Sequence, residues 1–358
     1  MLEQVAAALE HKDYPTAAKF LKQLLKESPD NPWVQFYLGR LYEGTGKHQE
    51  AEKIYRRLLR DTTNSKLLTQ ARQGLQRLED IVKQERQQAI AQATADPGNT
   101  ELGVLILEPL SNEFKTQAAQ KFAQIMHLDP YNARLLLPSR GWRLYRAGAV
   151  GELKYYGEQL RNAAIPCFWT TLAEIKKIQV FQVSHFLEST SGATAVCRND
   201  ANQLGSLNFD WSEVKGRVQG LLPIFEQVVD RDARRKLERK IQTQDYFQFC
   251  DLHLPSRGCI LRLYDNGYQF QQGTEIADNA SQNTIRINWN SLLSWMDRKL
   301  PQVGVSSDFA HFVETALDRT DLLSQIQSHM QLFRREPSYW DQAFHLYSSL
   351  VFVQNLKN

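Results

Sequence analysis

Residues 34–59 read VQFYLGRLYEGTGKHQEAEKIYRRLL, and this stretch decides how the first part of the chain folds. Apolar residues recur at three- and four-residue intervals on both sides of GTGKH, which predicts two helices joined by a short turn. Small residues at Gly39 and Ala51 allow the helices to approach closely, and the rings of Tyr42 and Tyr55 fill the groove between them. The stretch therefore predicts a pair of closely packed helices.

The residues before this pair repeat its pattern. Ala17 precedes Ala51 by one period of about 34 residues, and the same shift places Leu24 on Leu58. Over roughly residues 1–62 the chain resembles the tetratricopeptide repeat family. It departs from the family pattern at Thr63, where proline is usual, and at its opening aromatic, because Trp33 comes one place late and Pro32 stands in its position.

A polar helix predicted over residues 65–94 caps this stack and completes a first domain over residues 1–95. Two repeats and a cap make a short array, since such arrays usually contain three or more units. The array has two interpretations that the sequence leaves open. It is either a groove that docks a peptide or protein partner, or a platform for dimerisation or packing.

The turn cluster Asp96–Glu101 marks the predicted domain boundary, and the pattern then changes to mixed strands and helices. The apolar run GVLILEPL predicts a buried strand, and NEFKTQAAQKFAQIMHL predicts a helix. We expect an α+β fold: tetratricopeptide-like helices, two related α/β modules and a helical C-terminal tail. The modules are predicted over residues 101–230, with an insertion, and over residues 231–358, with the tail.

Two phrases carry the evidence for related modules. Residues 135–148 read LLLPSRGWRLYRAG and residues 252–267 read LHLPSRGCILRLYDNG. A second similarity follows in each module: Asp210-Trp211-Ser212 in the first and Asn288-Trp289-Asn290 in the second. A helix is predicted to begin at each of these trios. The first helix is predicted to run toward Pro223 and the second toward Pro301. Between the modules, RDARRKLERK over residues 231–240 predicts a helix with arginines four residues apart, either a solvated linker or an anion-binding face.

The arginines of the two phrases are candidates for binding a nucleotide. A guanidinium is a planar fork of donors suited to phosphate or to a guanine edge, and aromatic side chains beside it can stack on a base. The alternative is that these arginines pair with carboxylates and that Pro-Ser-Arg-Gly is an inherited turn. The candidate ligand-binding residues are Arg140, Trp142, Arg143, Tyr145, Arg146, Arg257, Arg262 and Tyr264.

The layout of a tetratricopeptide head followed by paired modules that bear the two phrases resembles a cyanobacterial family of cyclic di-GMP receptors. The resemblance implies a non-enzymatic receptor in which cyclic di-GMP changes how the protein engages a partner such as a transcription factor. The alternative is a ligand-free tetratricopeptide-type scaffold or assembly factor. An R-x-x-x-R run also suggests the PilZ type of cyclic di-GMP receptor, but the D-x-S-x-x-G motif of that type is absent from the sequence.

Composition excludes several other classes of protein. A net charge of +3 gives no global field for DNA or an anionic membrane, so we expect neither as a partner. No apolar run reaches the length of a membrane span and no signal peptide is recognisable, which predicts a cytoplasmic protein. We find no motif for an enzyme, a cofactor or a metal, and the four cysteines are expected to be buried free thiols. RNDANQLG, residues 198–205, is either a plain connection or a loop that lines a pocket.

Overall fold

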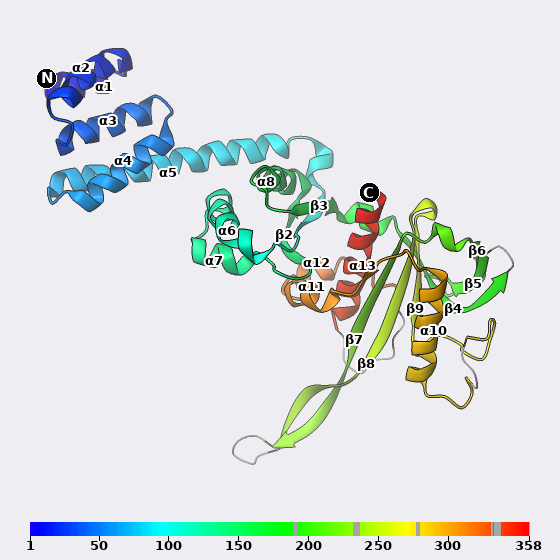
Figure 1. Cartoon of the computed structure of the whole chain (residues 1–358). Helices are drawn as coiled ribbons and strands as arrows, with labels where there is room; N and C mark the ends of the chain where they lie inside the picture. Colours follow the sequence, from blue (N-terminus) through cyan, green and yellow to red (C-terminus); the bar gives the residue numbers. More distant parts are fainter. Residues whose placement is uncertain (190–191, 232–236, 277–279, 331, 333–337, 358) are drawn as a thin grey trace. The chain divides into compact units, whose positions relative to one another are not determined.

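The computed structural model describes residues 1–189, 192–231, 237–276, 280–330, 332 and 338–357. The chain divides into two compact units, Met1–Gln92 and Ala93–Asn358 (Figure 1). The division lies close to residue 95, where the sequence predicts the end of the first domain. Helices make up the first unit, and mixed sheets followed by a C-terminal helix make up the second. The predicted α+β fold class is therefore confirmed.

The first unit is a stack of helices with short turns between them. Its helices are α1 (Leu2–Glu10), α2 (Tyr14–Glu27), α3 (Pro32–Gly44), α4 (His48–Asp61) and α5 (Ser65–Ala93). Side-chain caps fix two of the starts: a carboxylate oxygen of Asp13 accepts from the backbone N–H of Thr16, and the amide oxygen of Asn31 accepts from that of Trp33. Proline in the first turn of α2 and of α3 favours the same starts.

The second unit contains a small antiparallel sheet in the order β2-β1-β3. Its strands are β1 (Leu102–Leu107), β2 (Arg143–Ala149) and β3 (Cys167–Thr171). Helix α8 (Val150–Asn162) lies against this sheet, and Leu153 on α8 is fully buried. The run Val104–Leu107 in β1 is also fully buried, because both faces of the central strand are covered. Its continuous apolar sequence reflects this environment.

The larger sheet has the strand order β10-β7-β8-β9-β4-β5-β6, with parallel pairs at β10–β7 and β9–β4. Its strands are β4 (Gln179–Ser189), β5 (Gly192–Arg198), β6 (Leu204–Phe209), β7 (Gly216–Arg231), β8 (Leu237–Leu254), β9 (Cys259–Tyr264) and β10 (Val305–Ser306). In Figure 1, β7 and β8 form a long two-stranded ribbon that extends beyond the other strands of the sheet.

Helices cover both faces of this larger sheet. The remaining helices of the unit are η1 (Pro97–Thr100), α6 (Asn112–Met126), α7 (Pro130–Leu136), α9 (Leu172–Lys176), η2 (Trp211–Glu213), η3 (Pro255–Arg257), α10 (Ile285–Lys299), α11 (Phe309–Ala316), α12 (Thr320–Leu323) and α13 (Trp340–Lys357). Trp289 and Trp295 of α10 belong to one core cluster with β4, β5 and β9. Phe344 of α13 belongs to a second cluster, which joins β7 and β8 to the small sheet.

The sequence predictions at Asp210-Trp211-Ser212 and at Asn288-Trp289-Asn290 are both wrong. The predicted helix from Asp210 toward Pro223 is a single turn, η2, followed by strand β7. The predicted strand NTIRINW instead enters helix α10, which begins at Ile285 with Thr284 as its N-cap, so Asn288 and Asn290 lie inside the helix. In the first case pairing with β8 along the whole of β7 overrides the helical spacing, and Pro223 sits next to a register shift in that pairing.

The predicted division at residues 230–231 falls at the end of β7. Because β7 and β8 pair in one antiparallel hairpin, the two predicted modules contribute neighbouring strands to a single sheet. The predicted helix over residues 231–240 is replaced at its ends by strand: Arg231 closes β7 and Arg239 lies in β8. Its middle part, residues 232–236 with Arg235, lies outside the described residues.

The four cysteines are buried and free, as the sequence predicts. Burial raises the pKa of Cys167 and of Cys259 to about 11 and that of Cys250 to about 12. Burial also raises the pKa of Cys197. Separately, none of the helices formed by the described residues is both long and apolar enough to span a lipid bilayer.

Candidate functional site

The helical unit packs around the ring of Tyr55. A Cβ atom added at Gly39 or at Gly74 would lie 2.7 Å or 2.6 Å from this ring, so both positions require glycine. The hydroxyl of Tyr55 donates to Glu43 at 2.7 Å, and the guanidinium of Arg77 donates to the same carboxylate at 2.6 Å and 3.0 Å. Burial alone would raise the pKa of Glu43, but these hydrogen bonds outweigh it and lower the pKa.

Aromatic and basic side chains follow one face of α3. Trp33, Tyr37 and Arg40 are spaced by four and three residues, so they lie on the same side of the helix, and all three are half-buried. The rings of Trp33 and Tyr37 are 6.3 Å apart, and the ammonium of Lys66 on α5 lies 5.9 Å from the Trp33 ring. We call Trp33, Tyr37, Arg40 and Lys66 the α3 face.

The first arginine phrase turns into β2 through Gly141, whose φ of 58° lies in the left-handed region. Arg140 in this turn is exposed and Arg143 at the start of β2 is half-buried. Arg146 donates to Glu152 at 2.6 Å. The guanidinium of Arg146 also lies 5.1 Å from the ring of Tyr156.

The two aromatic residues of this phrase pack against the interior of the unit. Trp142 makes edge contacts with Phe168, at 4.9 Å between ring centroids, and with Tyr347 at 5.8 Å. Tyr145 makes an edge contact with Phe122 at 5.2 Å, and burial raises the pKa of the Tyr145 hydroxyl. Their rings therefore contribute to the core.

In the second phrase a single 3₁₀ turn, η3, joins β8 to β9, and the side chains have different partners. Gly258 also lies in the left-handed region, with φ of 63°. Arg257 makes a two-pronged ion pair with Glu213, at 2.6 Å and 2.7 Å. Arg262 is fully buried in β9 and makes a two-pronged pair with the equally buried Asp251 of β8, at 2.9 Å and 2.7 Å.

Tyr264, the last candidate residue of the second phrase, lies stacked on Phe249, with the rings 5.4 Å apart and inclined by 16°. Burial raises the pKa of its hydroxyl. Because β2 belongs to the small sheet and β9 to the middle of the larger one, none of the contacts described joins the arginines of one phrase to those of the other. The eight predicted ligand-binding residues thus lie in two separate environments.

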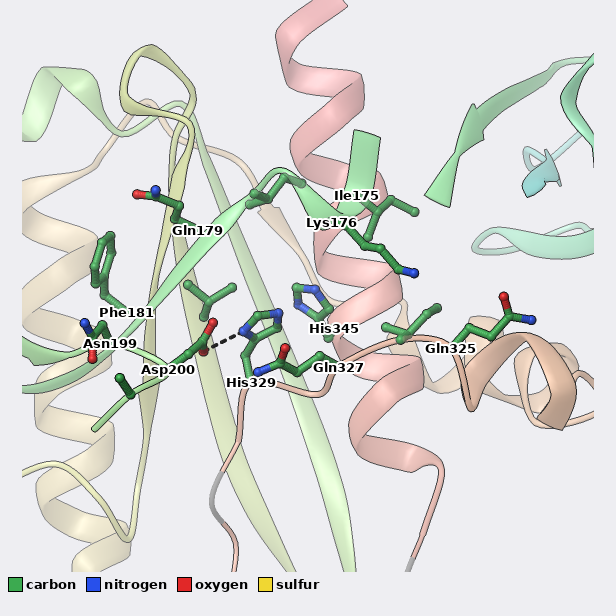
Figure 2. A pocket seen from close by; sticks show the side chains of 14 residues that line it. Ile175, Lys176, Gln179, Phe181, Asn199, Asp200, Gln325, Gln327, His329 and His345 are labelled. Atoms are coloured by element: carbon green, nitrogen blue, oxygen red, sulfur yellow. Dashed lines mark hydrogen bonds and ion pairs between the residues drawn. The ribbon is translucent and has the colours of Figure 1, made fainter. Parts of the chain in front are cut away.

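A cavity of about 700 Å³ lies elsewhere in the second unit, where β4 begins (Figure 2). None of the eight predicted residues lines it. Its wall comes from α9 and the start of β4, from the turn after β5, from the segment before residue 330 and from α13. The lining residues are Ile175, Lys176, Ile178, Gln179, Val180, Phe181, Asn199, Asp200, Ala201, Gln325, Ile326, Gln327, His329 and His345.

A carboxylate–imidazole pair bridges two sides of this cavity. Nδ1 of His329 lies 2.7 Å from Oδ1 of Asp200, as the dashed line in Figure 2 marks. The ring of His329 lies 4.6 Å from that of His345. His329 has φ of 53°, in the left-handed region, and its carbonyl accepts from the side-chain amide of Gln182 at 3.1 Å. A strained backbone of this kind is often found at ligand clamps.

A buried polar network supports the wall that His345 forms. Nδ1 of His345 lies 3.5 Å from the guanidinium of Arg262, and its Nε2 lies 3.4 Å from the hydroxyl of Ser349. Burial, followed by the charge of Arg262, lowers the pKa of His345 well below its ordinary value. The ring is therefore neutral, Nδ1 accepts from Arg262, and Nε2 carries the proton.

The network continues behind Arg262. The hydroxyl of Ser348 donates to Asp251 at 2.6 Å and lies 3.0 Å from Nε2 of His253. Burial lowers the pKa of His253 to about 4, so this ring is also neutral at pH 7. Because the hydroxyl proton goes to Asp251, the same oxygen accepts from the Nε2–H of His253. These bonds hold β8, β9 and α13 together behind the cavity.

The sequence offers only one signal for this cavity. Asn199, Asp200 and Ala201 belong to the polar loop over residues 198–205, for which the sequence allows either a plain connection or a pocket wall. His329 lies 129 residues from Asp200 in the chain, so no local motif links the two. Within the described residues, no group of three or more His, Cys, Asp or Glu side chains is placed to hold a metal ion.

Comparison with known proteins identifies the helical unit. The tetratricopeptide repeat family matches residues 8–75, which run from the end of α1 to the middle of α5. No curated protein and no solved structure matches the chain. Residues 8–75 therefore form a tetratricopeptide repeat region, a class of helical repeat that stacks to form protein-binding surfaces.

Proposed function

We propose that the protein is a non-enzymatic cytoplasmic adaptor that binds a protein partner through its tetratricopeptide region. The observation that carries this proposal is the family match over residues 8–75, together with the closely packed stack of α1 to α5. Repeat helices of this kind present an extended surface that a partner can contact over several helices at once. The proposal agrees with the interaction-scaffold alternative that the sequence suggested.

The α3 face is the part of the stack best suited to contact a partner. Tryptophan, tyrosine and arginine carry much of the binding free energy at protein interfaces. Here Trp33, Tyr37 and Arg40 lie in one row and each keeps part of its side chain accessible. Lys66 adds a further positive charge beside Trp33. We propose that this row contacts a partner that offers apolar and acidic groups.

Matched charge-removing variants of the full-length chain test this proposal. The test variant is Arg40→Ala with Lys66→Ala, and the control is Lys53→Ala with Arg56→Ala, on the exposed side of α4. Cross-linked partners would be captured from cells that make the protein and identified by mass spectrometry, and the affinity of each purified partner would be measured by calorimetry. We expect at least tenfold weaker binding by the test variant and no change in the control.

Circular dichroism of both variants would establish that the helices remain folded. The adaptor proposal fails if no partner binds the wild-type protein with a Kd below about 100 μM. Equal binding by the wild-type protein and the folded test variant would contradict the assignment of the α3 face.

Cyclic di-GMP binding, with a transcription factor as partner, stays a prediction that the sequence makes for the two arginine phrases. Arg257 and Arg262 each use two donors on a carboxylate, and Arg146 uses one, so a phosphate would have to compete with these carboxylates, which is why we favour the scaffold. Arg140 and Arg143 have no ion pair with the described residues and are the best candidates. Calorimetry of the wild-type protein and of Arg143→Ala with cyclic dinucleotides tests this second candidate.

A further inference from the structure

We propose that the cavity at the start of β4 binds a small uncharged ligand that presents an N–H donor beside a carbonyl or ring-nitrogen acceptor. Nucleobases and carboxamides both present such a donor beside an acceptor. The cavity is lined by residues of the second unit alone, and none of the eight predicted ligand-binding residues lines it, although Arg262 supports its wall from behind. Its volume of about 700 Å³ suits such a ligand, since small-molecule sites commonly enclose about 300–1,000 Å³.

The open edge of β4 supplies backbone groups to this cavity. From Gln179 to Gln182 the strand pairs with β9 on one side, whereas pairing with β5 begins only at Gln182. The N–H of Gln179 donates to Gly258 on the β9 side, at 3.1 Å. Since backbone groups alternate between the two edges of a strand, the N–H and C=O of Val180 point to the other edge, and Val180 lines the cavity. The strand thus presents one donor and one acceptor side by side.

Two glutamine side chains add the complementary groups. Gln179 and Gln327 line the cavity, are exposed, and have no hydrogen bond from their side-chain amides to the described residues. Each amide offers both a donor and an acceptor, which is the pairing by which glutamine reads the edge of a base. Asn199 is different, because Gln203 occupies both ends of its amide, at 3.0 Å and 2.9 Å.

The charges of the lining residues favour an uncharged ligand. Lys176 carries one positive charge and Asp200 one negative charge, so an ion of either sign would meet a like charge. His329 directs Nδ1 toward the carboxylate of Asp200. In the neutral ring this hydrogen bond places the proton on Nδ1 and leaves Nε2 as an acceptor for a ligand N–H.

The wall of the cavity is held in place before a ligand arrives. The carbonyl of Ser328 accepts from the buried Arg262 at 2.8 Å, and that of His329 accepts from Gln182 at 3.1 Å. These two contacts hold His329 in its left-handed conformation. A preformed wall lowers the conformational cost of binding.

Two ligand panels and matched glutamine variants test this assignment on the full-length protein. One panel consists of the four common ribonucleosides and the other of N-acetyl amino-acid amides. Saturation-transfer NMR would detect binding and calorimetry would measure the Kd. The lining variants are Gln179→Leu and Gln327→Leu, and the control is Gln302→Leu, which replaces an exposed glutamine that does not line the cavity.

We expect a member of one panel to bind with a Kd below about 1 mM, to bind each lining variant at least tenfold more weakly, and to bind the control with unchanged affinity. Binding by nucleosides alone would assign a nucleobase ligand, and binding by amides alone a carboxamide ligand. The proposal is overturned if neither panel binds the wild-type protein, or if the lining variants bind as tightly as the control.

Discussion

The two arginine phrases have nearly the same sequence and share a left-handed glycine, but helix α7 precedes the first turn, strand β8 precedes the second, and their side chains meet different surroundings. Gly141 and Gly258 both adopt left-handed conformations, with φ of 58° and 63°, and each is soon followed by a strand. Arg143 is half-buried in the small sheet, whereas its counterpart Arg262 is fully buried beside Asp251 in the larger one. Repetition of a phrase therefore predicts the left-handed glycine and the strand after it, but not the element before it or the environment of the arginine.

The largest expected difference between the phrases lies in these two arginines. Arg262→Ala leaves the charge of Asp251 buried and unpaired, so it should lower the free energy of unfolding by about 3–5 kcal/mol. Arg143→Ala removes no ion pair with a described residue and should cost less than about 1 kcal/mol. Urea denaturation of both variants measures the difference. If the two losses were equal, the contrast in environment would be wrong.

A double variant sharpens this comparison. Replacing both charges of the buried pair, as in Asp251→Leu with Arg262→Met, removes the unpaired charge that each single variant leaves. The double variant should therefore be more stable than Arg262→Ala alone. If the losses of the two single variants simply added in the double variant, Asp251 and Arg262 would not be energetically coupled, and the expectation would be wrong.

The second phrase should also make stability depend on pH. The folded-state pKa of His253 is about 4, below its ordinary value of 6.5, so the unfolded chain binds more protons within this window. Stability should be greatest above about pH 6.5 and should fall by about 1.4 kcal/mol per pH unit toward pH 4 from this residue alone. The buried ring of His345 should add to the fall in the same direction.

Urea titrations between pH 7.5 and 4.5 measure this slope, and His253→Gln is the comparison. The variant should show a shallower slope over the same range, whatever its stability at pH 7.5. An unchanged slope would mean that His253 is not the group responsible.

The two glycines should respond unequally to alanine. Both substitutions force a side chain into the left-handed region, at about 1–2 kcal/mol. A Cβ at Gly141 would also lie 2.9 Å from the Cβ of His311, whereas one at Gly258 would meet nothing within 4 Å. Gly141→Ala should therefore lower the thermal midpoint more than Gly258→Ala. The reverse order of the two midpoints would show that the helix carrying His311 moves away from the added Cβ at little cost in free energy.

The smallest effect is expected at Arg257. Its ion pair with Glu213 lies at the surface, with 38% of the Arg257 side chain exposed. Glu213→Gln should cost less than about 1 kcal/mol, and this cost should shrink further in 1 M salt as the charges are screened. Urea denaturation of the wild-type protein and of Glu213→Gln at low and high salt measures this loss of unfolding free energy. A loss comparable with that of Arg262→Ala would remove the contrast between the surface pair and the buried pair.

The sequence predicts those helices and strands whose conformation follows from the spacing of their own residues. The spacing of Gly39, Ala51 and Tyr55 gave the tetratricopeptide helices, and continuous apolar runs gave strands such as β1. Strand β7 was missed because a partner strand, not its own spacing, determines its conformation. The cavity was largely missed for a similar reason: Asp200 and His329 are 129 residues apart and meet only in the folded chain.

The four buried cysteines have a practical consequence for these experiments. With the pKa of Cys167, Cys250 and Cys259 near 11 to 12 and that of Cys197 raised, almost no thiolate forms at neutral pH, and burial also limits access of reagents. A cysteine introduced at an exposed site such as Arg56 should therefore react selectively with a maleimide dye. The native thiols can stay in place while fluorescence reports on partner binding at the α3 face.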